Sequence, residues 1–232
     1  TWLWVFLPLL PAFIFLTRLR RLWQQRRAAR LGVPVIVVGN ISVGGTGKTP
    51  FIMALARALL ADGLRVGIVS RGYGGQFAGQ TLEVYANTDP YLCGDEPALL
   101  AQSLGCSIVI GRDRVAAAQV LEQQGCHIIL SDDGLQHYRL ARDIEIVLID
   151  HQRQLGNGWC LPLGPLREAA SRLSEVDWVI YNGGAEPTSF TLIPKRFRKL
   201  ATHQQFPLTP WPWGDSPDVD ALAGIGNPER FF

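Results

Sequence analysis

The chain has 232 residues, of which 47% are hydrophobic and 18% are charged. This composition excludes an intrinsically disordered chain, and the length suffices for one large α/β domain or for one domain and the start of a second. Residues 1–61 hold eight Arg or Lys and no Asp or Glu, which leaves 14 basic and 20 acidic residues in the rest. The basic front indicates contact with an anionic surface. Nucleic acid is not an expected partner, because the basic residues adjoin an apolar segment.

The first predicted element is an apolar run at residues 2–16, followed at once by six arginines within residues 18–30. The run is shorter than the about 20 residues that a membrane-spanning helix needs, and Pro8 and Pro11 would disturb such a helix. We expect residues 1–31 to form an amphipathic helix lying in the membrane interface, with the remaining chain on the cytoplasmic side. The alternative is a helix buried against its own domain.

Strand and helix patterns alternate after this segment. Short apolar or β-branched runs predict strands at residues 35–38, 66–69, 82–85, 107–110, 127–130, 144–149 and 177–181. Helical spacing predicts helices at residues 48–61, 95–104 and 112–124. The alternation predicts an α/β fold, in which a mostly parallel sheet is flanked by helices in three layers. Ligands bind such sheets beyond the carboxyl ends of the strands.

The predicted main α/β domain, called the body below, occupies residues 32–206. Residues 207–232 are expected to be a linker rich in Pro and Trp, followed by the first strand of a second, truncated α/β domain. The chain begins without Met and stops on an apolar run, so we expect a fragment cut at both ends.

A phosphate-binding loop is predicted at residues 39–49, between the first strand and the first helix of this body. Its glycines let backbone N–H groups converge on phosphate oxygens, and the helix N-terminus adds a partial positive charge. Lys48 would reach the β- and γ-phosphates, and Thr49 would offer its hydroxyl to Mg²⁺. Ser42 stands where the usual P-loop pattern has its first glycine. The predicted nucleotide-binding residues are Gly44, Gly45, Thr46, Gly47, Lys48 and Thr49.

Asp132 and Asp133 follow another predicted strand and are the expected acidic partners of Mg²⁺. Two adjacent carboxylates would repel each other unless a cation lay beside them. The alternative is a solvated turn. The chain has no Asn-Lys-x-Asp run of the guanine-specific kind, which favours ATP over GTP.

Several motifs occur in a fixed order with this loop: Ser-Arg-Gly-Tyr-Gly at 70–74, Gly-Asp-Glu-Pro at 94–97, Asp-Asp-Gly-Leu-Gln-His at 132–137, and Gly-Asn-Gly at 156–158 with Pro-Leu-Arg-Glu at 165–168. Together they resemble the tetraacyldisaccharide 4'-kinase family over nearly the whole chain. The resemblance implies a P-loop kinase on the cytoplasmic face of the bacterial inner membrane. Such an enzyme transfers the γ-phosphoryl of ATP to the 4'-hydroxyl of a lipid A disaccharide precursor, which yields lipid IVA.

The resemblance also implies roles for single residues. Asp95 would be the catalytic base beside Lys48, although an Asp before Glu-Pro is also a plausible helix N-cap. The substrate-contacting segments of the family correspond to Arg114, Gln136, His137, Arg167 and Glu168. A histidine that approaches the catalytic Asp from the C-terminal domain of the family has no counterpart here. Two alternatives stay open: a P-loop ATPase or GTPase that drives assembly or insertion, and a nucleotide-binding module without catalysis.

Overall fold

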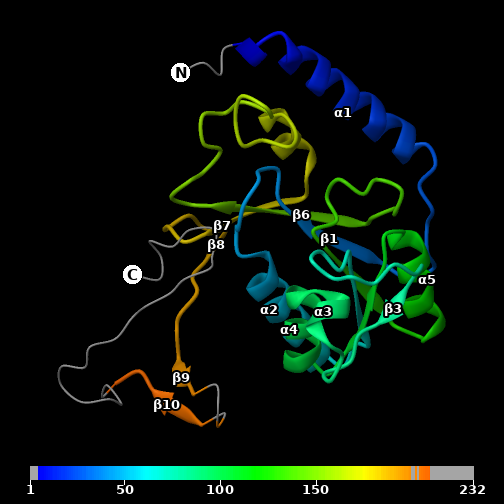
Figure 1. Cartoon of the computed structure of the whole chain (residues 1–232), viewed down its shortest axis with the longest axis vertical. Coiled ribbons are helices and arrows are strands. Elements are labelled where there is room, and N and C mark those ends of the chain that lie inside the picture. Colours follow the sequence, from blue (N-terminus) through cyan, green and yellow to red (C-terminus); the bar gives the residue numbers. More distant parts are fainter. Residues whose placement is uncertain (1–4, 200–201, 203, 210–232) are drawn as a thin grey trace.

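The computed structural model describes residues 5–199, 202 and 204–209 (Figure 1). Its centre is an eight-stranded sheet in the order β3-β4-β2-β5-β1-β6-β7-β8, and all neighbouring strands are parallel except β3 and β4. The strands are β1 (Val35–Gly39), β2 (Val66–Ser70), β3 (Leu82–Glu83), β4 (Ser107–Ile110), β5 (Ile128–Asp132), β6 (Ile144–Asp150), β7 (Trp178–Asn182) and β8 (Ser189–Phe190). The predicted mostly parallel sheet is confirmed.

Helices cover both faces of this sheet. They are α1 (Leu9–Gln25), α2 (Lys48–Ala61), α3 (Pro90–Cys93), α4 (Asp95–Ser103), α5 (Arg114–Gln123) and the 3-10 helix η2 (Ala170–Glu175). Strand β1 shows how the layers form, because its side chains alternate between two apolar clusters. Val35 and Val37 pack in the cluster that includes α5, whereas Ile36 and Val38 pack in the cluster that includes α2 and α4. The three-layer α/β/α architecture is therefore confirmed.

Most element boundaries match the sequence patterns to within two residues. Strand β3 is shorter than predicted, and β5 runs on to Asp132. Helix α5 begins at Arg114 because the Asp113 side chain accepts a hydrogen bond from the Val115 N–H at 3.0 Å, which caps the helix. The antiparallel pair β9 (Arg196–Arg198) and β10 (Gln205–Pro207) was not predicted. Most of the predicted linker and all of the second-domain strand lie outside the described residues.

Helix α1 contains both of the N-terminal prolines without a break. Pro8 is its N-cap and Pro11 lies in its first turn, where backbone N–H groups have no intrahelical partner to lose. One side of the helix packs on the core through Leu10, Phe13 and Ile14. None of the helices in the described part of the chain combines the length and the apolar character needed to cross a bilayer.

Replacing Leu130 tests whether the core carries the stability of the fold. Leu130 is fully buried in β5, so we expect Leu130→Ala to lower the free energy of unfolding by about 2–5 kcal/mol. Leu99 in α4 is 49% exposed, and Leu99→Ala is the matched control with a loss below about 1 kcal/mol. Chemical denaturation measures both, and equal losses would contradict the assignment of β5 to the core.

Candidate active site

Polar residues gather where the central strands end. Strands β1, β2, β5, β6 and β7 finish at Gly39, Ser70, Asp132, Asp150 and Asn182. These strands are parallel neighbours, so their carboxyl ends form one edge of the sheet. The loop from β1 to α2 leaves from the middle of this edge (Figure 1). This is the edge at which open α/β sheets bind ligands.

The loop between β1 and α2 has the backbone conformation expected for a phosphate cradle. Gly44 and Gly47 have positive φ angles of 104° and 85°, which residues with a side chain rarely adopt. Gly47 is the N-cap of α2, so the loop leads directly into the helix N-terminus, and Lys48 is the first residue of the helix. The loop geometry thus agrees with a P-loop at residues 44–49.

Ser42 departs from the P-loop pattern for a visible reason. It forms an antiparallel bridge with Leu166, so it has the extended conformation that any residue adopts. On one side of this bridge the Val43 N–H donates to the Pro165 carbonyl at 2.8 Å. On the other side the N–H of Arg167 donates to the Ile41 carbonyl at 2.7 Å. A glycine is therefore not required at Ser42.

Asp133 lies between two cationic side chains. Lys48 Nζ is 3.5 Å from Asp133 Oδ1, and Arg167 Nη1 is 3.3 Å from Asp133 Oδ2. Burial raises the pKa of Asp133, but Lys48 and Arg167 outweigh burial and bring the pKa below its usual range. Asp133 is therefore ionised at neutral pH and holds both cations beside the loop.

Asp132 is the most buried carboxylate of this edge, at 1% exposure. Its Oδ2 accepts a hydrogen bond from Ser70 Oγ at 3.4 Å, whereas Oδ1 has no hydrogen-bond partner among the described residues. Burial and the nearby charge of Glu96 raise its pKa from 3.8 to about 6, and Arg114 and Lys48 only partly oppose this. An unpartnered buried carboxylate oxygen is the kind of ligand that a hard cation such as Mg²⁺ prefers.

The other members of the site fit a magnesium ion held with phosphates. Thr49 is half-buried in the first turn of α2, directly after Lys48. No group of three or more His, Cys, Asp or Glu suited to a metal exists within the described ranges. Mg²⁺ does not require one, because it binds through one or two protein oxygens, water and substrate phosphates.

The residues predicted to contact substrate lie around this edge in different settings. Arg114 is 3% exposed, and its Nη1 donates to the Asp132 backbone carbonyl at 2.6 Å. Burial lowers the pKa of His137 to about 4, so this imidazole is neutral at neutral pH. Gln136 Nε2 donates to Glu168 Oε1 at 2.8 Å, while Arg167 keeps 31% of its side chain exposed.

Asp95 is the first residue of α4 and is exposed. The N-cap of α4 is Gly94, whose φ of 90° and close contact with the Tyr73 carbonyl require glycine. Asp95 therefore does not occupy the N-cap position of α4, which is the position that the alternative assigned to it. The adjacent Glu96 contributes to the raised pKa of Asp132, which places the start of α4 near the carboxylates of β5.

The sequence patterns assigned no role to two polar residues of this edge, Asn182 and Ser70. Asn182 is 3% exposed, and its Nδ2 donates to the Thr46 carbonyl at 3.1 Å. Ser70 donates to Asp132. Both are the last residue of a parallel strand, so the rule that ligands bind at strand carboxyl ends is the signal that could have found them.

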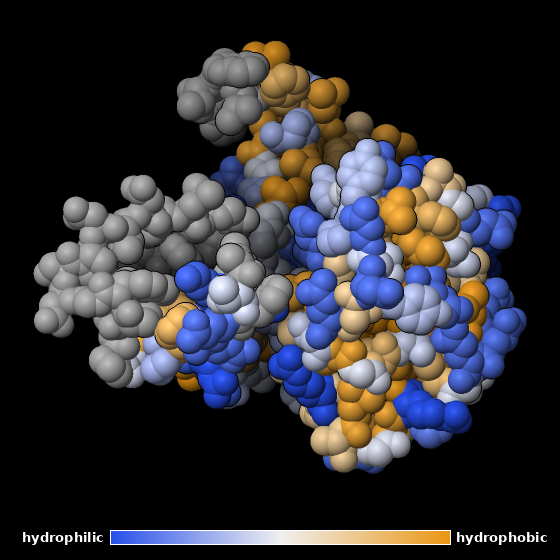
Figure 2. All heavy atoms as spheres, turned by 60° about the horizontal axis from the view of Figure 1, so that its bottom comes forward, coloured by the Kyte–Doolittle hydropathy of each residue, from blue (hydrophilic) through white to orange (hydrophobic). Residues whose placement is uncertain are grey.

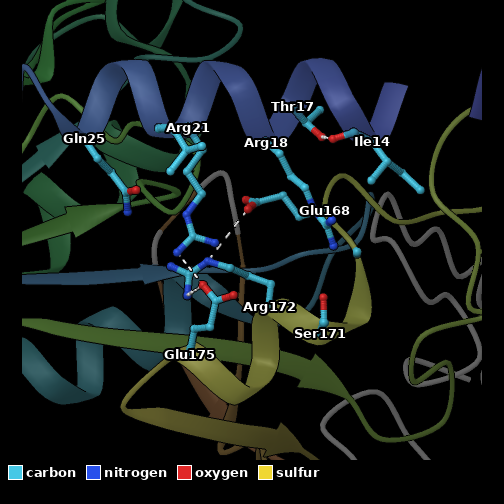
Figure 3. Close-up of a pocket in the computed structure, with 11 residues that line it drawn as sticks. Ile14, Thr17, Arg18, Arg21, Gln25, Glu168, Ser171, Arg172 and Glu175 are labelled. Atoms are coloured by element: carbon cyan, nitrogen blue, oxygen red, sulfur yellow. Dashed lines mark hydrogen bonds and ion pairs between the residues drawn. The ribbon is translucent and has the colours of Figure 1, made fainter. Parts of the chain in front are cut away.

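A cavity of about 280 Å³ lies between α1 and η2 (Figure 3). Arg21 from α1 pairs with Glu175 of η2 across it, and Arg172 of η2 lies 3.8 Å from both Glu168 and Glu175. The Arg21–Glu175 pair joins α1 to the body of the protein, and Arg172 adds to the charge on the η2 side of the cavity. The cavity is lined by Ile14, Thr17, Arg18, Arg21, Leu22, Gln25, Glu168, Ala169, Ser171, Arg172 and Glu175.

The strand, glycine loop and helix, with an aspartate at the end of the adjacent strand, define a P-loop α/β protein. A family model described as Tetraacyldisaccharide-1-P 4'-kinase matches residues 2–232, and the chain belongs to this family. It is 52% identical to the tetraacyldisaccharide 4'-kinase of Alkalilimnicola ehrlichii, over 97% of this chain and 69% of that protein. It is 50% identical to that of Stutzerimonas stutzeri, over 93% of this chain and 65% of that protein.

A solved structure is similar as well. The crystal structure of the "apo" form of LpxK from Aquifex aeolicus in complex with ATP superposes with a TM-score of 0.73 and 31% identity. The match covers 90% of this chain and 70% of that one. The chain thus spans about two thirds of the length of these relatives.

Replacing Asp132 by Asn should separate stability from ligand binding. Because the pKa of Asp132 is raised to about 6, its stabilising contribution is present in acid and is lost as the pH rises through that value. We expect Asp132→Asn to raise the free energy of unfolding at neutral pH, but not below the ordinary carboxyl pKa of 3.8. The same change should weaken Mg²⁺-ATP binding, because a neutral amide is a poorer ligand for the metal.

Chemical denaturation at neutral pH and at a pH below 3.8 measures the change in stability, and titration calorimetry measures the affinity for Mg²⁺-ATP. Asp62, exposed at the far end of α2, provides the control Asp62→Asn, which should change neither. Unchanged Mg²⁺-ATP affinity in Asp132→Asn would place the metal elsewhere.

Proposed function

We propose that this chain transfers the γ-phosphoryl group of ATP to the 4'-hydroxyl of tetraacyldisaccharide 1-phosphate. The product would be lipid IVA, a precursor of lipid A and lipopolysaccharide. The observation that carries this proposal is the family match over residues 2–232, and the P-loop at the carboxyl edge of the sheet agrees with it. ATP and Mg²⁺ are the co-substrate and the metal.

The phosphate loop and its neighbours would hold the nucleotide. Backbone N–H groups of residues 44–49 would surround the phosphates, and Lys48 would neutralise charge on the γ-phosphoryl as it moves. Thr49 and Asp132 would hold Mg²⁺, with Asp133 beside them. Bound there, the metal would offset the negative charge of the phosphate oxygens. Asp133 supports this by keeping Lys48 and Arg167 close to the loop.

Asp95 is the proposed base. Its carboxylate would take the proton of the 4'-hydroxyl while the sugar oxygen forms its bond to the γ-phosphorus. The bond from that phosphorus to the bridging oxygen breaks, and ADP leaves. Exposure at the start of α4 and proximity to Asp132 through Glu96 support this role, since a lipid-borne hydroxyl must reach the base from outside.

The five proposed substrate-binding residues divide by their surroundings. Arg167 keeps an exposed part and suits a phosphate, because its fork binds two oxygens. Arg114, Gln136 and Glu168 are engaged within the protein, so their proposed contribution is to fix the wall that the substrate meets. His137 would contribute as a neutral ring.

We also propose that α1 binds the cytoplasmic face of the inner membrane as a peripheral anchor. An acylated disaccharide stays in the bilayer surface, so its kinase must come to it. Support comes from the large apolar side chains that α1 and its flank expose, and Figure 2 shows apolar surface along this helix at the top of the view. They are Val5, Leu7, Leu9, Phe15, Leu16, Leu19, Leu22 and Trp23. The division into residues 1–31, 32–206 and 207–232 remains part of this proposal.

The kinase proposal is tested by incubating the chain with Mg²⁺-ATP and tetraacyldisaccharide 1-phosphate in detergent micelles. We expect mass spectrometry to find a lipid heavier by one phosphoryl group. Asp95→Ala should abolish this product while ATP still binds, because the base does not hold the nucleotide. Asp62 is an exposed aspartate at the C-terminal end of α2, so Asp62→Ala is the matched control and should keep activity. Free phosphate without lipid product would instead indicate a P-loop ATPase, and full activity of Asp95→Ala would refute its role.

The membrane proposal is tested by sedimentation with anionic phosphatidylglycerol vesicles. Leu16 and Leu19 are 60% and 51% exposed on α1, so the double variant Leu16→Gln, Leu19→Gln should weaken binding by about tenfold or more. Leu192, 50% exposed outside α1, provides the control Leu192→Gln with unchanged binding. Removing residues 1–30 should release the protein from vesicles. Vesicle binding that survives both changes would rule out α1 as the anchor.

A further inference from the structure

Three side-chain amides fix the backbone of the phosphate loop. Asn40 Nδ2 donates to the Gly44 carbonyl at 3.2 Å, and Gln136 Nε2 donates to the Asn40 carbonyl at 3.1 Å. Asn182 Nδ2 donates to the Thr46 carbonyl at 3.1 Å. The carbonyls of Asn40, Gly44 and Thr46 thus each accept a hydrogen bond from a side-chain amide.

Fixing a carbonyl also fixes the next N–H group. A trans peptide unit is planar, and its C=O and N–H point in opposite directions. Asn40 therefore sets the direction of the Gly45 N–H, and Asn182 sets that of the Gly47 N–H. Both N–H groups belong to the segment proposed to surround the phosphates. An anion site of this kind works only when its N–H groups already converge.

Asn182 is well placed for such a role. It is 3% exposed and ends β7, which is separated from β1 by β6 alone, so a rigid strand carries it. Gly47 packs so closely that an added Cβ would collide with Asn182 Nδ2 and lie 3.3 Å from the Phe190 ring. Asn40 is fully buried at the start of the loop. The two asparagines thus hold the loop from opposite ends.

We infer that Asn182 and Asn40 are positioning residues for nucleotide binding, acting through the loop carbonyls and not by touching the nucleotide. This inference rests on the proposed ATP binding. The loop would hold the β- and γ-phosphates. Loss of either asparagine hydrogen bond should therefore weaken the binding of ligands that carry those phosphates, and should leave the binding of a ligand that lacks them unchanged.

The test is the affinity of Asn182→Ala for ATP, ADP and AMP with Mg²⁺, measured by titration calorimetry. We expect the Kd for ATP and ADP to rise about tenfold, which corresponds to one hydrogen bond of ordinary strength, and the Kd for AMP to change less than about twofold. In turnover, KM for ATP should rise while kcat changes less than about threefold. Asn40→Ala should show the same pattern.

Asn157 provides a matched control, because its Nδ2 also donates to a backbone carbonyl, that of Leu163 at 2.9 Å, outside the phosphate loop. Asn157→Ala should leave all three affinities unchanged. Asn182→Ser is a milder second variant, for the case in which Asn182→Ala does not fold. Thermal unfolding shows whether each variant is folded.

The outcomes separate the two proposals. A wild-type chain that binds no ATP would overturn both. A wild-type chain that binds ATP, with Asn182→Ala and Asn40→Ala binding it equally well, would overturn this inference alone. An equal loss for ATP, ADP and AMP, or failure of both Asn182 variants to fold, would also overturn it, because the residue would then be structural.

Discussion

The site depends on placing two adjacent carboxylates at the end of β5 beside the phosphate loop. Such a pair repels itself unless cations lie close, and the fold supplies Lys48 and Arg167 to Asp133. Arg114 reaches the Asp132 backbone from the start of α5. These three cations come from elements that are distant in sequence. The arrangement therefore requires that α2, α5 and the segment around Arg167 all pack at the end of β5, and the same charges are positioned for an anionic ligand.

The phosphate loop and helix α1 belong to one continuous polar network. Gln136 contacts both the loop, through the Asn40 carbonyl, and Glu168. Glu168 accepts a hydrogen bond from the Tyr138 hydroxyl at 2.5 Å and lines the cavity beside α1. Arg172 lies in the same cavity, donates to Tyr138 at 3.2 Å and pairs with Glu145. The proposed membrane helix thus packs against side chains that also contact the nucleotide loop. This network would fix the membrane helix and the nucleotide site relative to each other.

Local patterns predicted most of the fold and part of the site. Strands β1, β2, β4, β5, β6 and β7 are apolar runs, and Lys48 follows its glycines directly, so both could be found in the sequence. The strand-end rule could mark Asn182 as a residue of this edge, but no sequence spacing records its contact with Thr46, which is 136 residues away. The sequence also left two interpretations of Asp95 open, a helix N-cap and a catalytic base. The structure places Gly94, and not Asp95, at the N-cap position of α4, while the role of Asp95 as a base stays a proposal.

Asp132 explains why this edge of the sheet is suited to a ligand. Burial raises its pKa to about 6, so at neutral pH Asp132 is still mostly ionised, in surroundings that favour its charged form less than water does. One of its oxygens finds no hydrogen bond among the described residues. Selection for stability alone would favour a neutral side chain here. A cation bound to this oxygen would recover the lost interaction, so under the proposed metal role the unfavourable burial of Asp132 would strengthen the binding of Mg²⁺.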